Sequence, residues 1–441
     1  MLGSPYQGYL YAYPHKTAYR PLRPRPDLAG VWAGERTDAL FLYVHVPYCE
    51  MRCGFCNLFT RALPPAEQVA RYLDQLALQA GRVAAALGGQ ARFARVAIGG
   101  GTPTYLTAAE LTRLVDTVES SVGVRLADVP VSVETSPATA TPDRLAVLVA
   151  RGASRISIGV QSFVDAEAHA AGRPQRRAEV ERALAAIRAA GPAVLNLDLI
   201  YGIPGQTAQT WARSLRAALS WRPEELYLYP LYVRPLTGLG RSSAAPASGP
   251  DPDWDAQRLA LYRQARDTLL ASGYRQESMR YFRRADAAGP DGPQYCCQDD
   301  GMVGLGCGAR SYTTRLHYSF DYAVGVPHVR AILDDYLRRP AADFDVAEVG
   351  FALDGVEQRR RWLLKSLLRA PGASQSGYAQ RFGGPLFGDF PQLARLVDAG
   401  YAVHDADTVR LTDEGLAYSD AIGPWLVSPA VRHAMAEYPA R

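Results

Sequence analysis

Three of the chain's six cysteines stand close together, in the segment "YVHVPYCEMRCGFCNLFT". Cys49, Cys53 and Cys56 are separated by three and then two residues. Thiolate is a soft ligand, and three thiolates on one loop can bind three corners of a cubane iron–sulfur cluster. The fourth iron would then stay open to a small molecule. A zinc site would require a fourth ligand at finger-like spacing, and the nearby His45 is expected to point along its strand, away from the loop.

The elements that must position this loop form a repeating alternation. Helical patterns separate six apolar, β-branched runs: "LFLYVHVP", "ARVAIGG", "VPVSVETS", "RISIGVQSF", "VLNLDLIYGIP" and "ELYLYPLY". Strand, helix, strand at this spacing predicts a parallel sheet built of crossovers. Polar or glycine-rich sequence ends five of the strands, where α/β sheets place their sites. We therefore expect an α/β fold, a partial (β/α)6 barrel of the TIM type with one site at its mouth.

The chain divides into four predicted parts. Residues 1–38 are an N-terminal arm over the main domain, 39–235 are the barrel core, 236–343 extend the barrel on the substrate side, and 344–441 form a C-terminal domain. A small-residue, proline-rich loop covers 237–253. Helices near 356–369 and 391–399 precede two short strands in "YAVHDADTVRLTDEG", which indicates a small helical, winged-helix-like module.

Composition excludes several classes of protein. Among 441 residues, 48% are hydrophobic and 21% charged, and the net charge of +4 is too small and scattered to favour nucleic acid or an anionic membrane as partner. The sequence has no run of eighteen apolar residues and no signal-peptide pattern at its start, so a cytoplasmic location is expected. Thiols stay reduced there, which favours metal binding over disulfides.

A wider set of motifs carries a resemblance. "YVHVPYCEMRCGFC", "GGGTPT", "SVETSP", "RISIGVQSF", "AAGRPQ", "NLDLIYGIPGQT" and "GLGCGARSY" occur in this order over roughly residues 40–430. The ordered set resembles the radical S-adenosylmethionine (SAM) superfamily and, within it, the oxygen-independent coproporphyrinogen III oxidase (coproporphyrinogen dehydrogenase) family. That family's relatives include a haem chaperone, C-methyltransferases and a cyclopropanase. The resemblance implies the radical SAM kind of partial barrel.

The resemblance also assigns a site. It implies that Cys49, Cys53 and Cys56 hold a 4Fe-4S cluster and that SAM chelates the open iron. The residues that it places around SAM are Tyr43, Phe55, Gly99, Gly100, Gly101, Thr102, Glu134, Gln161, Arg173 and Asp198. From the residues alone, three glycines permit close backbone approach to a ligand, and lone polar groups interrupting apolar runs are costly. Helix caps and internal hydrogen bonds are the alternative reading of these polar residues.

The expected activity is that of a radical SAM oxidoreductase. Its cluster would cleave SAM reductively to a 5′-deoxyadenosyl radical that abstracts hydrogen from an organic substrate such as a porphyrinogen. Two alternatives stay open: a C-methyltransferase or cyclopropanase that uses a second SAM, and a haem-binding carrier with little turnover. Leu58 and Asn57 occupy positions where the oxidases have cysteine and the chaperones aspartate. Expected partners are a small-molecule substrate, such as a tetrapyrrole, and an electron donor such as flavodoxin or ferredoxin.

Other reactive residues have plainer interpretations. Cys307 lies in a glycine-rich segment and is interpreted as a packing residue, and the adjacent Cys296 and Cys297 as buried or incidental thiols. His15 and Lys16 belong to a basic, aromatic arm that is either a solvated strap or a cover for an anionic substrate.

Overall fold

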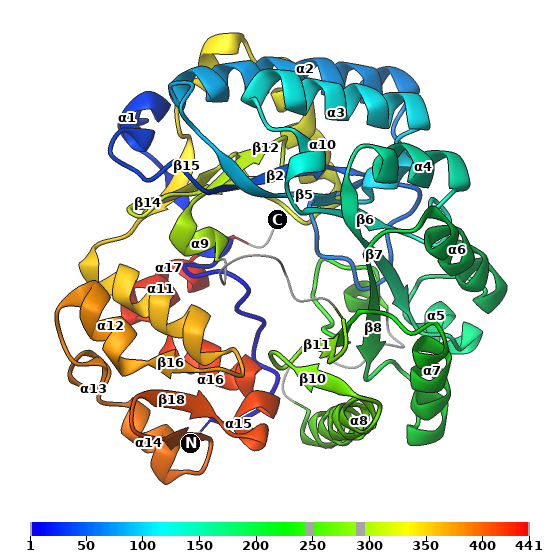
Figure 1. The fold of residues 1–441 in the computed structure, drawn as a ribbon, viewed down its shortest axis with the longest axis vertical. Coiled ribbons are helices and arrows are strands. Elements are labelled where there is room, and N and C mark those ends of the chain that lie inside the picture. Colours follow the sequence, from blue (N-terminus) through cyan, green and yellow to red (C-terminus); the bar gives the residue numbers. More distant parts are fainter. Residues whose placement is uncertain (1, 243–250, 288–295, 440–441) are drawn as a thin grey trace.

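One long sheet organises the molecule. The structure is a computed structural model, and it describes residues 2–242, 251–287 and 296–439. Thirteen of the described strands form a single sheet, with helices along its outer face and a smaller C-terminal part beside its open side (Figure 1). Residues 243–250 of the predicted loop 237–253 lie outside the described ranges.

The centre of the sheet is parallel. Seven neighbouring strands run in the order β12 (Met302–Leu305), β2 (Leu40–Val46), β5 (Phe93–Gly100), β6 (Val131–Thr135), β7 (Ala153–Gln161), β8 (Val194–Tyr201) and β9 (Glu225–Pro230). Six of them are the apolar runs of the sequence, so the predicted partial barrel is confirmed. β12 is an additional parallel strand that is not one of the six apolar runs. Its short sequence contains a glycine and gives little strand signal.

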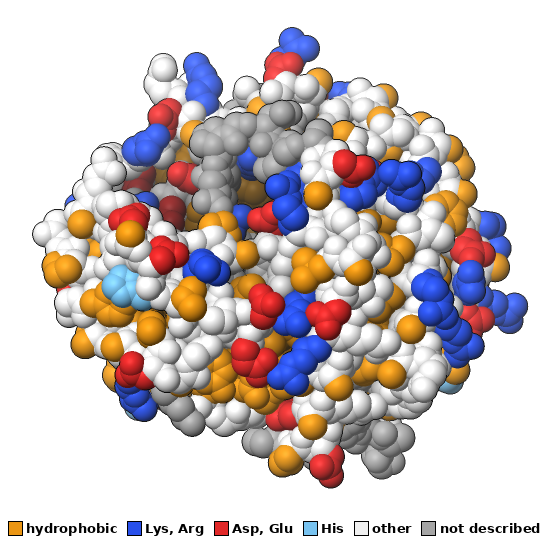
Figure 2. Space-filling view, turned by 60° about the horizontal axis from the view of Figure 1, so that its bottom comes forward, with side chains coloured by type: hydrophobic (Ala, Val, Ile, Leu, Met, Phe, Trp, Pro, Cys, Tyr) orange, Lys and Arg blue, Asp and Glu red, His pale blue; other side chains and the backbone are white. Residues whose placement is uncertain are grey.

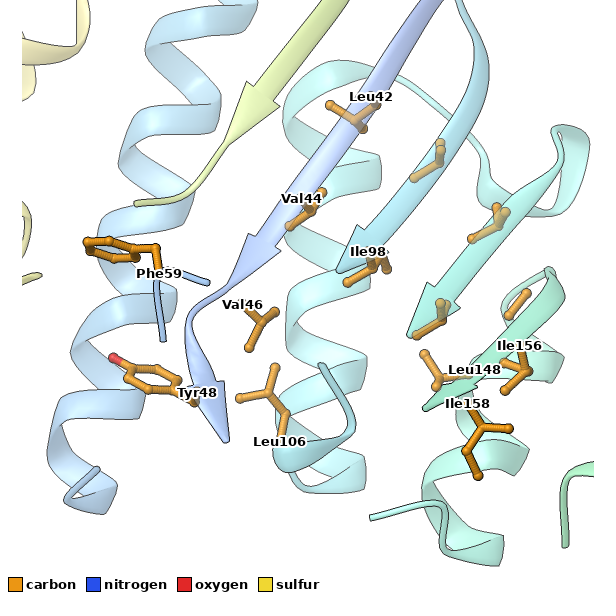
Figure 3. Close-up of a cluster of buried hydrophobic side chains, with 14 of the residues drawn as sticks. Leu42, Val44, Val46, Tyr48, Phe59, Ile98, Leu106, Leu148, Ile156 and Ile158 are labelled. Atoms are coloured by element: carbon orange, nitrogen blue, oxygen red, sulfur yellow. The ribbon is translucent and has the colours of Figure 1, made fainter. Parts of the chain in front are cut away.

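Helices cover the outer face of these strands (Figure 1). They are α2 (Ala66–Ala86), α3 (Ala108–Val122), α4 (Pro142–Ala150), α5 (Asp165–Ala170), α6 (Arg177–Ala190), α7 (Ala208–Ser220) and α8 (Pro252–Ala271). Leu42, Val44 and Val46 alternate along β2 and pack with Ile98 of β5 beneath the helices (Figure 3). Because side chains alternate along a strand, the intervening residues of β2 face the barrel interior.

Antiparallel strands extend both edges of the parallel centre. Beyond β9 lie β11 (Tyr281–Arg284) and β10 (Tyr274–Gln276). Beyond β12 lie β13 (Arg310–Tyr312), β14 (Leu316–Ser319), β15 (Val349–Ala352) and β1 (Arg20–Pro21). The short helices α1 (Leu28–Trp32), α9 (Cys297–Asp300) and α10 (Val326–Tyr336) accompany this second edge. The described strands therefore form an open barrel.

The C-terminal part is a helical module with a small sheet. Its elements are α11 (Gly355–Leu367), β16 (Ala373–Ser374), α12 (Gln375–Phe382), α13 (Leu386–Asp389), α14 (Leu393–Asp398), β17 (Ala402–His404), β18 (Thr408–Leu411), α15 (Asp413–Ala417), α16 (Ser419–Leu426) and α17 (Pro429–Ala436). The strand order β16-β18-β17 gives the wing, and α11 and α14 are the two helices expected from the sequence.

The N-terminal arm joins the two parts. Leu2, Tyr13 and Ala18 are buried in the hydrophobic core of the C-terminal module. The arm then continues into β1, which pairs with β15 in the main sheet. The four-part division of the chain stays a prediction, but the arm plainly runs between barrel and C-terminal module. On the face shown in Figure 2, acidic and basic side chains are interspersed.

Candidate functional site

The cysteine loop is tied down at both ends. It begins with β3 (Tyr48–Cys49), which pairs with β4 (Arg61–Ala62) on the returning chain. In its middle, the Gly54 amide donates to the Gly172 carbonyl at 3.0 Å. A Cβ on Gly54 would lie 2.8 Å from the Ala171 carbonyl oxygen, so only glycine permits this approach. The loop between the second and third cysteines is therefore docked on the segment that follows α5.

The three thiols lie on the wall of one large cavity. Cys49, Cys53 and Cys56 are reduced, and Cys49 Sγ lies 3.3 Å from Thr102 Oγ1. Burial raises the pKa of the Cys49 thiol, and it raises that of Cys53 to about 11. A bound metal centre would reverse this cost, because coordination deprotonates thiols. Within the described ranges, no three His, Cys, Asp or Glu side chains are gathered as ligands of one metal ion.

The glycine-rich end of β5 passes directly beneath the cysteine loop. The Gly101 amide donates to the Val46 carbonyl at 2.8 Å, and the Thr102 amide to the Tyr48 carbonyl at 2.7 Å. A Cβ on Gly101 would lie 2.5 Å from the Tyr48 oxygen and 3.0 Å from Cys49 Sγ. Gly100 has a φ of +121°, which also requires glycine. These glycines hold the backbone against the first thiol.

Two carboxylates stand on neighbouring parts of the barrel interior. Glu134 on β6 accepts a hydrogen bond from the Gly100 amide at 3.0 Å, and Asp198 on β8 accepts one from Asn196 Nδ2 at 2.8 Å. Both side chains line the cavity yet are surrounded by protein. Burial raises the pKa of Glu134 to about 7 and that of Asp198 to about 6. Such carboxylates suit the ammonium and sulfonium groups of a cationic ligand.

Gln161 and Arg173 meet over the end of β7. Gln161 sits at a register shift between β7 and β8 with a φ of +66°, a strained conformation for a residue with a side chain. A Cβ on Gly159 would lie 2.7 Å from Gln161 Nε2 and 3.1 Å from Arg173 Nη1. The bulge thus turns an amide and a guanidinium toward the cavity, which both residues line.

Eleven of the thirteen predicted site residues line this cavity: Cys49, Cys53, Phe55, Cys56, Gly100, Gly101, Thr102, Glu134, Gln161, Arg173 and Asp198. Tyr43 and Gly99 do not line it. The Tyr43 hydroxyl lies 3.2 Å from His45 Nδ1, and His45 Nε2 lies 3.2 Å from the Phe59 carbonyl oxygen, so both side chains are engaged inside the barrel. At Gly99, a Cβ would lie 2.8 Å from the Glu134 carboxylate.

The two ends of the chain contribute to the lining of the cavity. Its volume is about 1310 Å³. Arm residues and residues of the C-terminal module line it together with the barrel, and its aromatic side chains are Tyr9, Tyr11, Phe55, Tyr229, Tyr232, Tyr322, Trp425 and Tyr438. Single small-molecule sites fall between about 300 and 1,000 Å³, so this space can take more than one molecule.

Sequence reasoning missed several lining residues. Glu50 lies between two site cysteines and accepts a hydrogen bond from the Ser136 hydroxyl at 2.7 Å. Tyr229 lies on β9, where tyrosines alternate in "ELYLYP", and that period of two could have flagged it. Trp425 and Tyr438 carried no local signal, since only the tertiary fold brings them to the cavity.

The other cysteines lie outside this site. Cys307 is fully buried in the main hydrophobic core, in keeping with a packing role. Cys297 packs in a small cluster with Ala12, Met302 and Tyr312, next to Cys296. None of the three lines the cavity.

Comparison with known proteins shows which protein family a part of this chain resembles. A model of the radical SAM superfamily matches residues 43–218. The solved structure of coproporphyrinogen III oxidase (HemN) from Escherichia coli has the same fold, with a TM-score of 0.76, 24% sequence identity, and coverage of 90% of this chain and 92% of that chain. Residues 43–218 thus resemble a radical SAM domain, and the predicted cofactors, a 4Fe-4S cluster and SAM, are those of that superfamily.

Two relatives show which proteins this chain resembles in sequence. The heme chaperone HemW of Escherichia coli is 27% identical over 396 residues, which are 87% of this chain and 97% of the relative. The mitochondrial radical S-adenosyl methionine domain-containing protein 1 of the mouse is 33% identical over 292 residues. This match covers 65% of the chain and 64% of the mouse protein, so it leaves over a third of that relative unmatched. No helix among the described residues has both the length and the hydropathy needed to cross a membrane.

Proposed function

We propose that this chain is a radical SAM enzyme that removes a hydrogen atom from a large organic substrate held in the capped cavity. The observation that carries the proposal is that three free thiols, the glycines Gly100 and Gly101 and the carboxylates of Glu134 and Asp198 line one cavity. When bound, a reduced 4Fe-4S cluster supplies one electron to SAM, whose cleavage gives methionine and a 5′-deoxyadenosyl radical.

The residues divide this task. Cys49, Cys53 and Cys56 would hold the cluster, and their fit is supported by their places on the wall of one cavity, with no disulfide between them. Glu134 and Asp198 would face the positive and hydroxyl groups of SAM, and Arg173 its carboxylate, by charge-assisted hydrogen bonds. The remaining predicted SAM contacts are Tyr43, Phe55, Gly99, Gly100, Gly101, Thr102 and Gln161.

The cap has a separate role. A primary carbon radical reacts with water-borne reductants and oxygen, so the reacting groups must be enclosed. The arm and α16–α17 supply this enclosure through Tyr9, Trp425 and Tyr438. The chain's own contribution to the reaction is therefore positioning and exclusion.

The size and aromatic lining of the cavity favour a substrate as large as a tetrapyrrole. Coproporphyrinogen III is the first candidate. Haem carriage is the second, because the match to HemW spans 97% of that relative. Asn57 and Leu58 both line the cavity, so the two departures from the relatives lie where a substrate would be met. C-methylation with a second SAM is the third outcome that the test below separates.

The test is anaerobic reconstitution with iron and sulfide, followed by reduction and mass analysis of SAM products with and without coproporphyrinogen III. We expect 5′-deoxyadenosine, and a Cys53→Ala variant that has lost both iron and product. Cys296→Ala is the matched control, because this thiol lies outside the cavity. S-adenosylhomocysteine would indicate methyl transfer, and haem binding without 5′-deoxyadenosine would indicate a carrier. A Cys53→Ala variant with unchanged iron content would overturn the ligand assignment.

A further inference from the structure

One wall of the cavity carries basic side chains that have no ion-pair partner within the described part of the chain. Lys16 of the arm, Arg234 after β9 and Arg310 of β13 all line the cavity. None of the ion pairs among the described residues includes any of the three. The charges of all three act on the same side chain, that of His15. Burial first, and then the charges of Lys16, Arg310 and Arg234, lower the pKa of His15 to about 3.

Aromatic rings contact the side chains of Lys16 and Arg234. Burial, and then the charge of Arg310, lower the pKa of Lys16 well below its usual value, and an anion bound beside it would favour its charged form. Lys16 Nζ lies 3.3 Å from the centroid of the Tyr322 ring, and the Arg234 guanidinium lies 4.8 Å from that of Tyr232. Arg310 Nη1 donates to the Tyr11 hydroxyl at 2.7 Å, while its Nε is buried with no hydrogen-bond partner. A guanidinium has five N–H donors in a planar fork that matches an oxyanion. Burying such groups without a counter-charge is costly.

The acids of the same cavity are committed elsewhere. Its acidic lining residues are Glu50, Glu134 and Asp198, which hydrogen-bond Ser136, the Gly100 amide and Asn196 respectively. The charged groups with the largest effect on the pKa of Glu134 are Asp198 and Arg155. The cavity is thus divided into an acidic floor, proposed above for SAM, and a basic wall under the arm.

The basic wall also opens toward a second space. A pocket of about 620 Å³ is lined by Lys16, Arg310, Tyr322 and Tyr438, the same four residues that line the main cavity at this point. Arg20, Arg23 and Arg25 of the arm also line it, and so do the acidic residues Asp321 and Glu348. Arg20 is paired with Glu437 at 3.6 Å and Arg25 with Glu348 at 3.7 Å. A group that extends from the main cavity past Arg310 would therefore enter a predominantly basic passage.

We propose that Arg310, Lys16 and Arg234 form an oxyanion subsite that binds a carboxylate or phosphate substituent of the substrate and so orients it over the SAM side of the cavity. The inference rests on the proposed function for its purpose, but anion binding can be measured without turnover. Arg310 is a positioning residue in this scheme, since it holds a part of the substrate remote from the reacting atoms.

The test uses two probes on reconstituted protein, with and without SAM: the tricarboxylate tricarballylate and inorganic phosphate. Binding is followed by calorimetric titration and by thermal shift at matched ionic strength, with the neutral propane-1,2,3-tricarboxamide as blank. We expect at least one anion to bind, and Arg310→Gln and Lys16→Met each to weaken it by about tenfold or more, the effect of one charge-assisted hydrogen bond. The preferred probe distinguishes carboxylate from phosphate.

A matched control is Arg330→Gln, which removes an exposed charge on α10 and should leave anion binding unchanged. Without ligand, Arg310→Gln should melt at the same temperature as the parent or higher, because a buried uncompensated charge has been removed. Equal affinity in parent and Arg310→Gln, or no binding of either anion to the folded parent, would overturn the subsite. If the parent protein forms no 5′-deoxyadenosine, that result would instead contradict the proposed function.

Discussion

The floor and the cap of the cavity are built on opposite plans. The floor consists of strand ends and the cysteine loop, and its close contacts are made between backbone atoms, as at Gly54 and Gly101. The cap consists of the arm and the C-terminal module, joined by side chains from distant parts of the sequence. Asp420 of α16 shows this plan, because Arg280 of the barrel edge and Tyr232 both donate to its carboxylate. The floor is thus rigid by geometry, and the cap is held by charge and packing.

Breaking the floor should have the largest effect. Gly101→Ala places a Cβ 2.5 Å from the Tyr48 carbonyl oxygen, so the strip must move away from Cys49. We expect iron after reconstitution to fall from about four per chain to less than one. Iron and sulfide analysis measures this. Gly81→Ala in α2 is the control, since a Cβ there meets nothing within 4 Å. Full iron in Gly101→Ala would show that the contact does not matter for the cluster.

Breaking the cap should cost stability and spare the floor. Arg280→Met leaves Asp420 buried without its partner, which costs about 3–5 kcal/mol. We expect a lower thermal midpoint and faster proteolysis of residues 355–439, with iron content unchanged. The double variant Arg280→Met with Asp420→Leu should recover most of the loss, because an apolar pair replaces the buried charges. A loss of iron in Arg280→Met would mean that cap and floor are coupled.

A pH titration sharpens the comparison at the floor alone. The pKa of Glu134 is about 7 in the folded chain and ordinarily 4.5, so between these values the folded state holds a proton that the unfolded state releases. The parent should therefore lose stability relative to Glu134→Gln as pH rises from about 4.5 to 7, and the gap should then stay constant. Thermal midpoints of SAM-free protein against pH measure this. A parent-to-variant gap that is flat with pH would refute the raised pKa.

The smallest effect concerns the rim of the cysteine loop. Leu63 is 71% exposed and has a φ of +47°, a conformation that costs a leucine about 1–2 kcal/mol. Leu63→Gly should relieve this strain and, after the entropy cost of glycine, stabilise the protein by up to about 1 kcal/mol. Urea unfolding measures the change. Leu63→Ala keeps the strained φ and should give no gain, and a gain equal to that of glycine would contradict the explanation.

The strands that form the floor could be predicted from the sequence, because the apolar pattern of each strand lies within a few consecutive residues. Six apolar runs predicted six parallel strands, and eleven of the thirteen residues that the family resemblance assigned to the site line one cavity. Tyr43 and Gly99 belong to the same strands but lie just outside the cavity lining. The place of β12 as a seventh parallel strand was not predicted, since four residues with a glycine give no periodicity and its pairing partner β2 is some 260 residues away.

The cap could not be predicted from the sequence, for a physical reason. The arm has no amphipathic period of its own, because Leu2 and Tyr13 find their apolar environment only in helices beyond residue 355. The basic wall combines Lys16, Arg234 and Arg310, residues from three separate segments. In a chain with 48 lysines and arginines, their presence in the sequence selects nothing. Their shared lack of acidic partners is visible only in three dimensions.

The placement of Leu2 and Tyr13 in the C-terminal core has a consequence for biosynthesis. Leu2 and Tyr13 are translated about 350 residues before most of the residues that bury them, so they find their packing partners late. The barrel and its cysteine loop can meanwhile assemble. A nascent chain that ends before residue 355 therefore has an incomplete cavity lining, because Trp425 and Tyr438 are still missing from it.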